Sequence, residues 1–193
     1  MEGILKMSKI STKLAIGLFS AVSAISFFAT SAFAEYLNGK WNVSTVYYED
    51  YNLESKYSDG LWYAADKWNG ISKNIDIYPA DKKKAHVKVK HLSRSEDNKL
   101  GFAGTYGLGI PYNSKGEVDK NPYASGEVII VRYLCDKLDE GETINTIAHE
   151  FGHILGLAHT TKSFTDSIMD PNDVFDVDGP TKYDKDNLKN LYK

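Results

Sequence analysis

The sequence is poor in cysteine and in clustered positive charge. Of its 193 residues only Cys135 is a cysteine, so no disulfide bond can form within the chain. No stripe of lysine and arginine marks a nucleic-acid surface. Internal repeats and low-complexity linkers are also missing, and after the N-terminal region no apolar segment is long enough to span a bilayer. These absences argue against a nucleic-acid-binding protein, a disulfide scaffold and a multi-span membrane protein.

The first 34 residues have the pattern of a secretory signal peptide. Three lysines precede an apolar run over about 14–29, and the Ala-Phe-Ala at 32–34 matches the small-x-small pattern that signal peptidases cut. The run is interrupted by serines and is shorter than the ~20 residues of a membrane span, so an uncleaved anchor is the less favoured alternative. Cleavage there leaves 193 − 34 = 159 residues, 35–193, which suits one secreted domain. A secreted chain without disulfides fits a bacterium exporting across a single membrane.

The spacing of apolar residues predicts strands alternating with two or three helices. Helical spacing predicts an amphipathic helix at 61–70, a longer one at 142–156 and a closing helix at 183–193. Strands are expected at 74–80, 86–92 and 126–134, and the glycine-rich segment 101–112 gives a weaker prediction of an edge strand with bulges. Such an order of elements indicates a single α/β or α+β domain.

Three of the five histidines lie within the eleven residues 149–159, in "HEFGHILGLAH". Residues four apart share one face of a helix, so His149 and His153 can direct their imidazoles at one point. On a continuous helix His159 would lie about 15 Å further along the axis, out of reach of the same ion. Gly156 can take the left-handed conformation that ends a helix and reverses the chain. We therefore predict that His149, His153 and His159 bind one catalytic Zn²⁺ whose fourth position stays open to water.

Glu150 neighbours the first predicted ligand but points about 100° away around the helix. It is therefore expected to act beside the metal as the general base on the zinc-bound water, and not as a ligand. Chance assembly of the full pattern His-Glu-x-x-His-x-x-Gly-x-x-His in a chain of this composition is on the order of 10⁻⁵, which argues against coincidence.

This pattern resembles the signature of the metzincin zinc endopeptidases, and His149, Glu150, His153, Gly156 and His159 match it completely. Metzincins also carry a methionine turn beneath the metal. The sequence "SIMDP" places Met169 ten residues after the third histidine. Within the clan the chain is most similar to matrixins, the family of the matrix metalloproteinases. This narrower resemblance rests on Thr160, which follows the third histidine, and on Pro171, which completes the Met-x-Pro of the turn. The closing pair Leu191 and Tyr192 adds to it.

The resemblance implies an α+β zincin fold: a mixed, twisted sheet with an antiparallel edge strand, an active-site helix and a C-terminal helix. It implies a metalloendopeptidase that cuts extracellular proteins, with protein or peptide substrates as its partners. Binding to nucleic acid and stable membrane association are not expected. The protein is expected to be a monomer. In matrixins the segment before the active-site helix forms the upper edge of the cleft, so the same role is expected for 101–111.

Some matrixin features are missing from the sequence. There is no room for a propeptide carrying the inhibitory cysteine, and Cys135 is expected to be an ordinary buried thiol. Only His86 and His91 remain for a second, structural zinc, so they are interpreted as ordinary strand or loop residues. The aspartate-rich segment 166–186 contains "DVDG", which resembles the start of a calcium loop but lacks its glutamate. Calcium binding is left open without support.

Two other functions compete with proteolysis. A zinc amidase acting on a non-protein substrate would use the same ligands, but the complete metzincin pattern disfavours it. A non-catalytic, zinc-stabilised binding module would have no need of Glu150, and a purely structural site usually has a fourth protein ligand.

Overall fold

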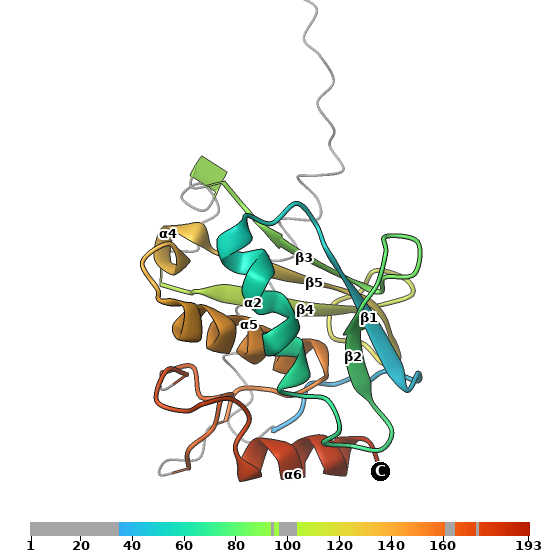
Figure 1. Cartoon of the computed structure of the whole chain (residues 1–193). Coiled ribbons are helices and arrows are strands. Elements are labelled where there is room, and N and C mark those ends of the chain that lie inside the picture. Colours follow the sequence, from blue (N-terminus) through green and yellow to red (C-terminus); the bar gives the residue numbers. More distant parts are fainter. Residues whose placement is uncertain (1–34, 94, 97–103, 161–164, 173) are drawn as a thin grey trace, which may run out of the picture.

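The computed structural model describes residues 35–93, 95–96, 104–160, 165–172 and 174–193. The predicted signal peptide, 1–34, lies outside these residues. The described part contains a five-stranded mixed sheet and four helices, which confirms the predicted α+β fold (Figure 1). In chain order the elements are β1 Thr45–Asp50, α2 Ser55–Asp66, β2 Asp76–Pro79, β3 Val87–His91, β4 Gly107–Asn113, β5 Tyr123–Ile130, α4 Arg132–Cys135, α5 Glu140–Ile154 and α6 Lys182–Leu191.

The sheet has the strand order β2-β1-β3-β5-β4. Three of its four pairings are parallel, and only β4 runs antiparallel to its neighbour β5. The expected antiparallel edge strand is therefore present, and β4 is the outermost strand on its side. Its predicted first residues, 101–103, lie outside the described part of the chain. A register shift between Tyr112 and Asn113 supplies the irregularity that the glycine-rich sequence predicted.

Three sequence-based predictions differ from the structure: the helix expected at 61–70 is α2 at Ser55–Asp66, one strand ends early, and one strand was missed. The strand predicted at 126–134 ends at Ile130, and α4 follows after Val131. The Val131 carbonyl accepts hydrogen bonds from the N–H groups of Leu134 and Cys135, so the chain forms a helical turn where an extended strand was expected. An apolar run does not distinguish the end of a strand from a short helix. Strand β1 was not predicted, although Val46 and Tyr48 alternate with more exposed neighbours.

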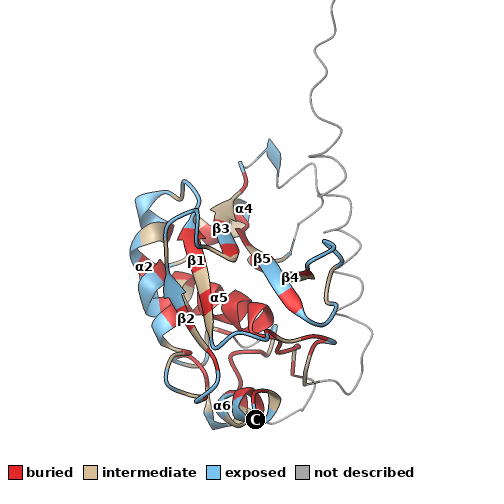
Figure 2. Cartoon of the chain, turned by 90° about the vertical axis from the view of Figure 1, so that its right-hand side faces the viewer, coloured by how far each residue is buried: buried red, intermediate tan, exposed pale blue. Residues whose placement is uncertain are grey.

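Helices α2 and α5 pack on one face of the sheet, and α6 lies below α5 (Figure 1). Helix α5 is buried over most of its length, whereas α2 presents an exposed side to solvent (Figure 2). Two buried tryptophans fix α5 by hydrogen bonds to its main chain: the indole N–H of Trp68 donates to Ala148 and that of Trp41 to Ile154. The helix that carries two predicted ligands is thus held along its length.

The start of α5 is capped as its sequence demands. Asp139 accepts a hydrogen bond from the N–H of Glu142, and the Glu142 side chain accepts one from the N–H of Asp139. This reciprocal capping box satisfies main-chain donors that the helix leaves without partners. Among the described residues, no helix combines the length and the apolar character needed to cross a membrane.

Candidate metal centre

The three predicted ligands converge in the structure. His149 and His153 lie one turn apart on α5, with ring centroids 4.8 Å from each other. The helix ends at Ile154, and Gly156 follows with φ of +94°, in the left-handed region that glycine adopts easily. The chain then reverses and brings His159 back, so that its Nε2 lies 3.2 Å from that of His149 and 3.1 Å from that of His153.

Main-chain carbonyls fix the orientation of the two helical imidazoles. Nδ1 of His149 lies 2.6 Å from the carbonyl of Ile168, and Nδ1 of His153 lies 2.8 Å from the carbonyl of Leu157. A carbonyl can only accept, so in both rings Nδ1 carries the hydrogen and the neutral ring presents the Nε2 lone pair to the centre. Such partners on the far nitrogen are usual for metal-binding histidines.

The electrostatics of the site favour neutral imidazoles. Burial lowers the pKa of His149, and burial followed by the neighbouring imidazoles lowers that of His153 well below its ordinary value. Burial and then the proximity of His149 lower the pKa of His159 to about 3. Three neutral rings with converging nitrogen atoms form a metal-ligand set, because a cation relieves the mutual repulsion of their lone pairs.

The spacing of the nitrogens fits a tetrahedral ion. Ligands at 2.0–2.1 Å from a tetrahedral metal lie about 3.3 Å from one another. The two observed Nε2 separations are 3.2 and 3.1 Å. Among the described residues no further histidine, cysteine or carboxylate joins this group. The triad can hold a metal ion, and the described part of the chain leaves one coordination position to a non-protein ligand.

Glu150 lies beside the triad without belonging to it. Its side chain is buried and lines the same pocket as the three histidines. Burial raises the pKa of its carboxyl to about 8, and a hydrogen bond from the main chain of Gly109 opposes this rise. A cation held by the histidines would lower this pKa further, since positive charge stabilises the carboxylate. The hydrogen bond from Gly109 and a cation held by the histidines would thus both act against the effect of burial on this pKa.

Strand β4 approaches α5 so closely that only glycine fits at two positions. A Cβ on Gly107 would lie 2.7 Å from Oε1 of Glu150. A Cβ on Gly109 would lie 2.2 Å from the main-chain oxygen of Glu150 and 2.9 Å from the Cβ of His153. The glycines that weakened the sequence-based strand prediction are thus what allows β4 to lie directly against the metal-binding helix.

Replacing Gly109 with alanine should separate β4 from α5. The added Cβ meets main-chain atoms, which cannot move aside as a flexible side chain could. We expect a loss of about 1–3 kcal/mol in the free energy of unfolding, measured by urea denaturation. Gly141→Ala is the matched control, because its Cβ would have an ordinary 3.5 Å contact with Asp139. Equal stability of the two variants would show that the close approach is not needed.

Met169 occupies the position expected of a hydrophobic floor. It is only 2% exposed. A Cβ added to Gly152, which lies between the two helical ligands, would come within 2.3 Å of the Met169 Sδ, so the methionine packs directly against the helix there. The Met169 carbonyl also accepts a hydrogen bond from the N–H of Thr160, the residue after the third ligand. The methionine segment therefore contacts both the helix and the loop that supply the ligands.

The C-terminal helix supports this segment through Asp184, which is 1% exposed. Its carboxylate accepts hydrogen bonds from the Ser167 hydroxyl and from the N–H of Ile168. Because the carbonyl of Ile168 in turn binds Nδ1 of His149, a continuous chain of hydrogen bonds runs from α6 to a ligand. Sequence reasoning missed Asp184, since only the tertiary structure brings it to the methionine segment.

The N-terminal residues of the described chain brace the loop between the second and third ligands. Tyr36 forms an antiparallel bridge with Leu157. The N–H of Leu37 donates to the Gly156 carbonyl at 2.8 Å, and the N–H of Ala158 donates to the Glu35 carbonyl at 3.1 Å. The same Leu157 presents its carbonyl to His153, so this bridge also steadies a ligand.

The ligands face a pocket of about 280 Å³ between β4 and the segment after Met169. Its lining is as follows: Gly104, Thr105, Tyr106, Gly107, Leu108 and Gly109 from the β4 side, Thr146, His149, Glu150 and His153 from α5, and His159, Pro171 and Val174. The described part of the predicted cleft edge, 104–111, thus contributes six of these residues.

The remaining sequence-based assignments fall outside the pocket. Cys135 is a buried thiol, as predicted, and burial raises its pKa to about 12. The ring of His86 accepts a hydrogen bond from the N–H of Tyr47. His91 is the last residue of β3, and its ring packs against the ring of Tyr57.

Comparison of the chain with models of known protein families and with curated proteins found no match to either.

Proposed function

We propose that this protein is a secreted, zinc-dependent metalloendopeptidase of the metzincin type, most like a matrixin. One observation carries the proposal: the ligand atoms of three imidazoles lie within 4.8 Å of one another beside a buried glutamate, with the His159 Nε2 3.2 and 3.1 Å from those of His149 and His153. The complete metzincin motif and the buried methionine beneath it support the same assignment.

The donor set is suited to zinc. Three neutral imidazoles, two of them with a second hydrogen bond to a main-chain carbonyl, and one position without a protein ligand are typical of catalytic zinc sites. Zinc, when bound, lowers the pKa of a water molecule towards neutrality and polarises a substrate carbonyl. His149, His153 and His159 would hold it.

Glu150 is assigned the proton transfers. Its carboxyl lies at the pocket, next to the ligands, and receives a hydrogen bond from the main chain of Gly109. A carboxylate there accepts the proton of the attacking water and then delivers it to the leaving amine. Burial raises the pKa of this carboxyl above its ordinary value, and a cation held by the histidines would lower it again.

The open edge of β4 is suited to an extended peptide. The N–H of Val131 donates to the carbonyl of Tyr106, so this opposite pair is hydrogen-bonded. In an antiparallel ladder such pairs alternate, and Gly107, Gly109 and Pro111 therefore direct their main-chain groups away from β5. The Gly109 N–H already donates to Glu150 and the Gly107 carbonyl accepts from the Thr105 hydroxyl, so a substrate strand would pair through the Gly107 N–H and the Gly109 carbonyl. Pro111, which has no N–H, limits the pairing at the far end.

The competing functions are less well supported. A structural zinc module gives no reason for a buried carboxylate at the pocket, because burying it without a partner cation or a role is costly. A zinc amidase would need no strand edge beside its metal. The glycine-lined edge of β4 therefore favours a polypeptide substrate.

Hydrolysis of casein or gelatin by residues 35–193 tests the proposal. We expect cleavage that a chelator abolishes and that about one equivalent of zinc restores. Peptide products should appear only with the metal present. Zinc binding without any hydrolysis of protein substrates would favour the binding module, and turnover confined to non-peptide amides would favour the amidase.

A further inference from the structure

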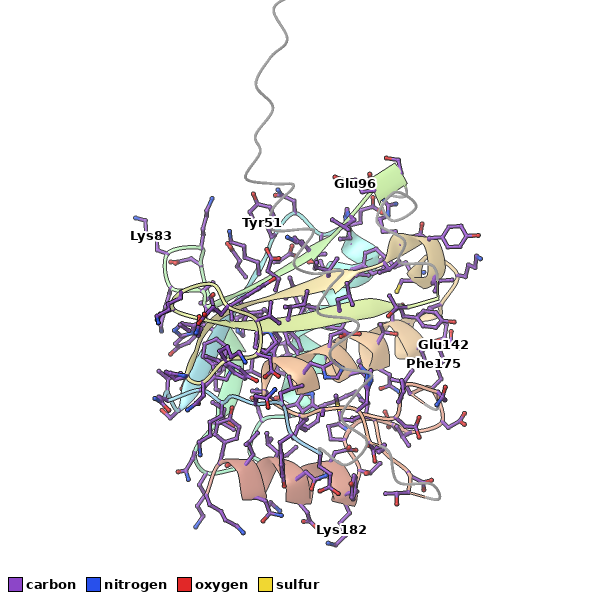
Figure 3. The ribbon with its side chains drawn as sticks, turned by 180° about the vertical axis from the view of Figure 1, so that it is seen from behind. Tyr51, Lys83, Glu96, Glu142, Phe175 and Lys182 are labelled. Atoms are coloured by element: carbon purple, nitrogen blue, oxygen red, sulfur yellow. The ribbon has the colours of Figure 1, made fainter. Side chains whose placement is uncertain are left out.

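A group of lysine and tyrosine side chains lies on the face of the sheet that points away from α2 and α5. The buried Val46 and Tyr48 of β1 pack into the core on the helix side, so Tyr47 points to the opposite face. Tyr51 continues this alternation, because its N–H still pairs with the carbonyl of Val89 on β3. Tyr51 and Lys83 are both labelled at the upper left of Figure 3, which views the molecule from behind.

Three lysine ammonium groups lie over these two rings. Nζ of Lys84 is 3.7 Å from the centroid of the Tyr47 ring. Lys82 and Lys88 both approach Tyr51, with Nζ 5.9 and 5.3 Å from its centroid. Because the negative face of an aromatic ring attracts a cation, the two tyrosines hold three flexible lysines along the direction of β1.

These cations have no carboxylate partner. Four residues, which we call the lysine row, are exposed and form no ion pair within the part of the chain that the structure describes: Lys82, Lys83, Lys84 and Lys88. Lys90, at the next outward position of β3, differs because its Nζ lies 2.7 Å from a carboxylate oxygen of Glu127. The lysine row therefore carries positive charge that no ion pair within the described chain neutralises.

Two acidic residues lie near the lysine row without cancelling its charge. Glu49 lies between the two rings along β1 but is only 7% exposed. The carboxylate of Asp81 accepts hydrogen bonds from the N–H groups of Lys83 and Lys84. Segment 81–90 contains five lysines and one aspartate, a formal charge of +4, so the rest of the chain carries −3 − 4 = −7. A polyanion is thus attracted to this segment and repelled by the remainder of the chain.

We propose that the lysine row is a binding surface for a linear phosphodiester polymer of the cell exterior, such as poly(glycerol phosphate). The row lies on β1, β3 and the loop between β2 and β3, whereas the metal-binding pocket lies between β4 and the segment after Met169. Binding would hold the protein at the polymer and leave the pocket open. The proposal is independent of the proposed peptidase function.

The chemistry of lysine favours phosphate groups that are spaced along a chain. An ammonium is a compact point charge that binds phosphate, whereas the arginine fork suits bidentate recognition, and segment 81–90 contains no arginine. Tyr47 and Tyr51 are four residues apart, which is about 13 Å along a strand, so the row is longer than one phosphate group. A flexible chain can place successive phosphates along it, and the predicted secretion brings the protein to the side of the membrane where such polymers lie.

Two other polyanions fit the lysine row less well. Single-stranded nucleic acid gains much of its affinity from bases that stack on aromatic rings. The Tyr47 ring already has Lys84 over it and stacks on His86, with centroids 5.7 Å apart and planes at 28°. A membrane presents its anionic groups in a plane, whereas the lysine row follows the direction of one strand.

Binding of end-labelled poly(glycerol phosphate) to the purified protein, measured by fluorescence anisotropy at several salt concentrations, tests the proposal. Four lysines that each displace counterions predict a slope of about −3 for log K against log salt concentration. The double variant Lys84→Gln with Lys88→Gln should reduce this slope to about −1.5 and weaken binding at least about tenfold at 50 mM salt.

The matched control is Lys185→Gln with Lys189→Gln, because both lysines are exposed on α6 and the same two charges are lost. Its affinity should stay within about twofold of the wild type. An equal loss in the two double variants would show that only net charge matters, and would overturn the proposal. Absence of binding by the wild-type protein would do the same.

The role of the rings has its own pair of variants. Tyr51→Phe keeps the ring beside Lys82 and Lys88, and Tyr51→Leu removes it. The phenylalanine variant should bind like the wild type, and the leucine variant should bind about threefold more weakly. Equal affinity in the two variants would overturn the part of the ring in ordering the lysine row.

Competition identifies the class of polyanion. Single-stranded DNA with the same number of phosphates, and phosphatidylglycerol vesicles with the same total charge, should each displace the labelled polymer less effectively than unlabelled poly(glycerol phosphate). Stronger displacement by the DNA or by the vesicles would overturn the assignment in favour of that polyanion. Zinc content and casein hydrolysis should be unchanged in the lysine variants, so a failure of the proposed peptidase function would be seen separately.

Discussion

Glu150→Gln should retain its fold and its zinc and lose peptide hydrolysis by about 10²–10⁴-fold. Glutamine has nearly the same shape and its side-chain oxygen can still accept the hydrogen bond from Gly109, but it cannot take up a proton. The loss should appear in kcat, measured with a fluorogenic peptide, because the interaction removed is made during reaction.

Glu140→Gln is the matched control, since Glu140 is exposed in the first turn of the same helix. Metal content and circular dichroism of both variants should equal those of the wild type. Near-normal turnover by Glu150→Gln would remove the general base from the proposed function and revive the binding-module alternative.

His159→Ala should abolish stable zinc binding. The two ligands left on α5 supply only half of a tetrahedral set, and the turn at Gly156 would no longer bring a third. Metal analysis after dialysis should fall from about one equivalent per chain to well below it. Thermal stability in the presence of zinc should fall as well, by about 4 kcal/mol if free zinc is held at 1,000 times the wild-type dissociation constant.

His86→Asn serves as the control for His159→Ala, because His86 lies outside the triad and its ring nitrogen accepts a hydrogen bond from the N–H of Tyr47. It should keep its zinc. Full occupancy in His159→Ala would contradict the three-ligand centre.

The ligand set could be predicted from sequence because its geometry is local. Two histidines four apart on one helix and a glycine that reverses the chain determine where the third histidine arrives, and all of this lies within eleven residues. The antiparallel edge strand followed from the family resemblance, whereas the capping box that Asp139 and Glu142 form at the start of α5 was not predicted.

The supports of the site could not be predicted, because each is a contact between distant segments. No local pattern indicates that Asp184 will bind the main chain of Ile168, or that Tyr36 will form a bridge with Leu157. The glycines of β4 were noticed but interpreted as a weakness of the strand. These positions are glycine because α5 approaches β4 closely there, and only the packed structure reveals this contact.

The support from α6 has a consequence for the order in which the chain is made. Ribosomes release the N-terminal part of a protein first, so all three ligands emerge before Asp184 does. Until α6 docks, the Ile168 main chain lacks its hydrogen bond to Asp184, which is one support of the carbonyl that orients His149. A chain made only as far as residue 160 thus carries every candidate ligand, but His149 gains this support only after residues 182–191 have been made.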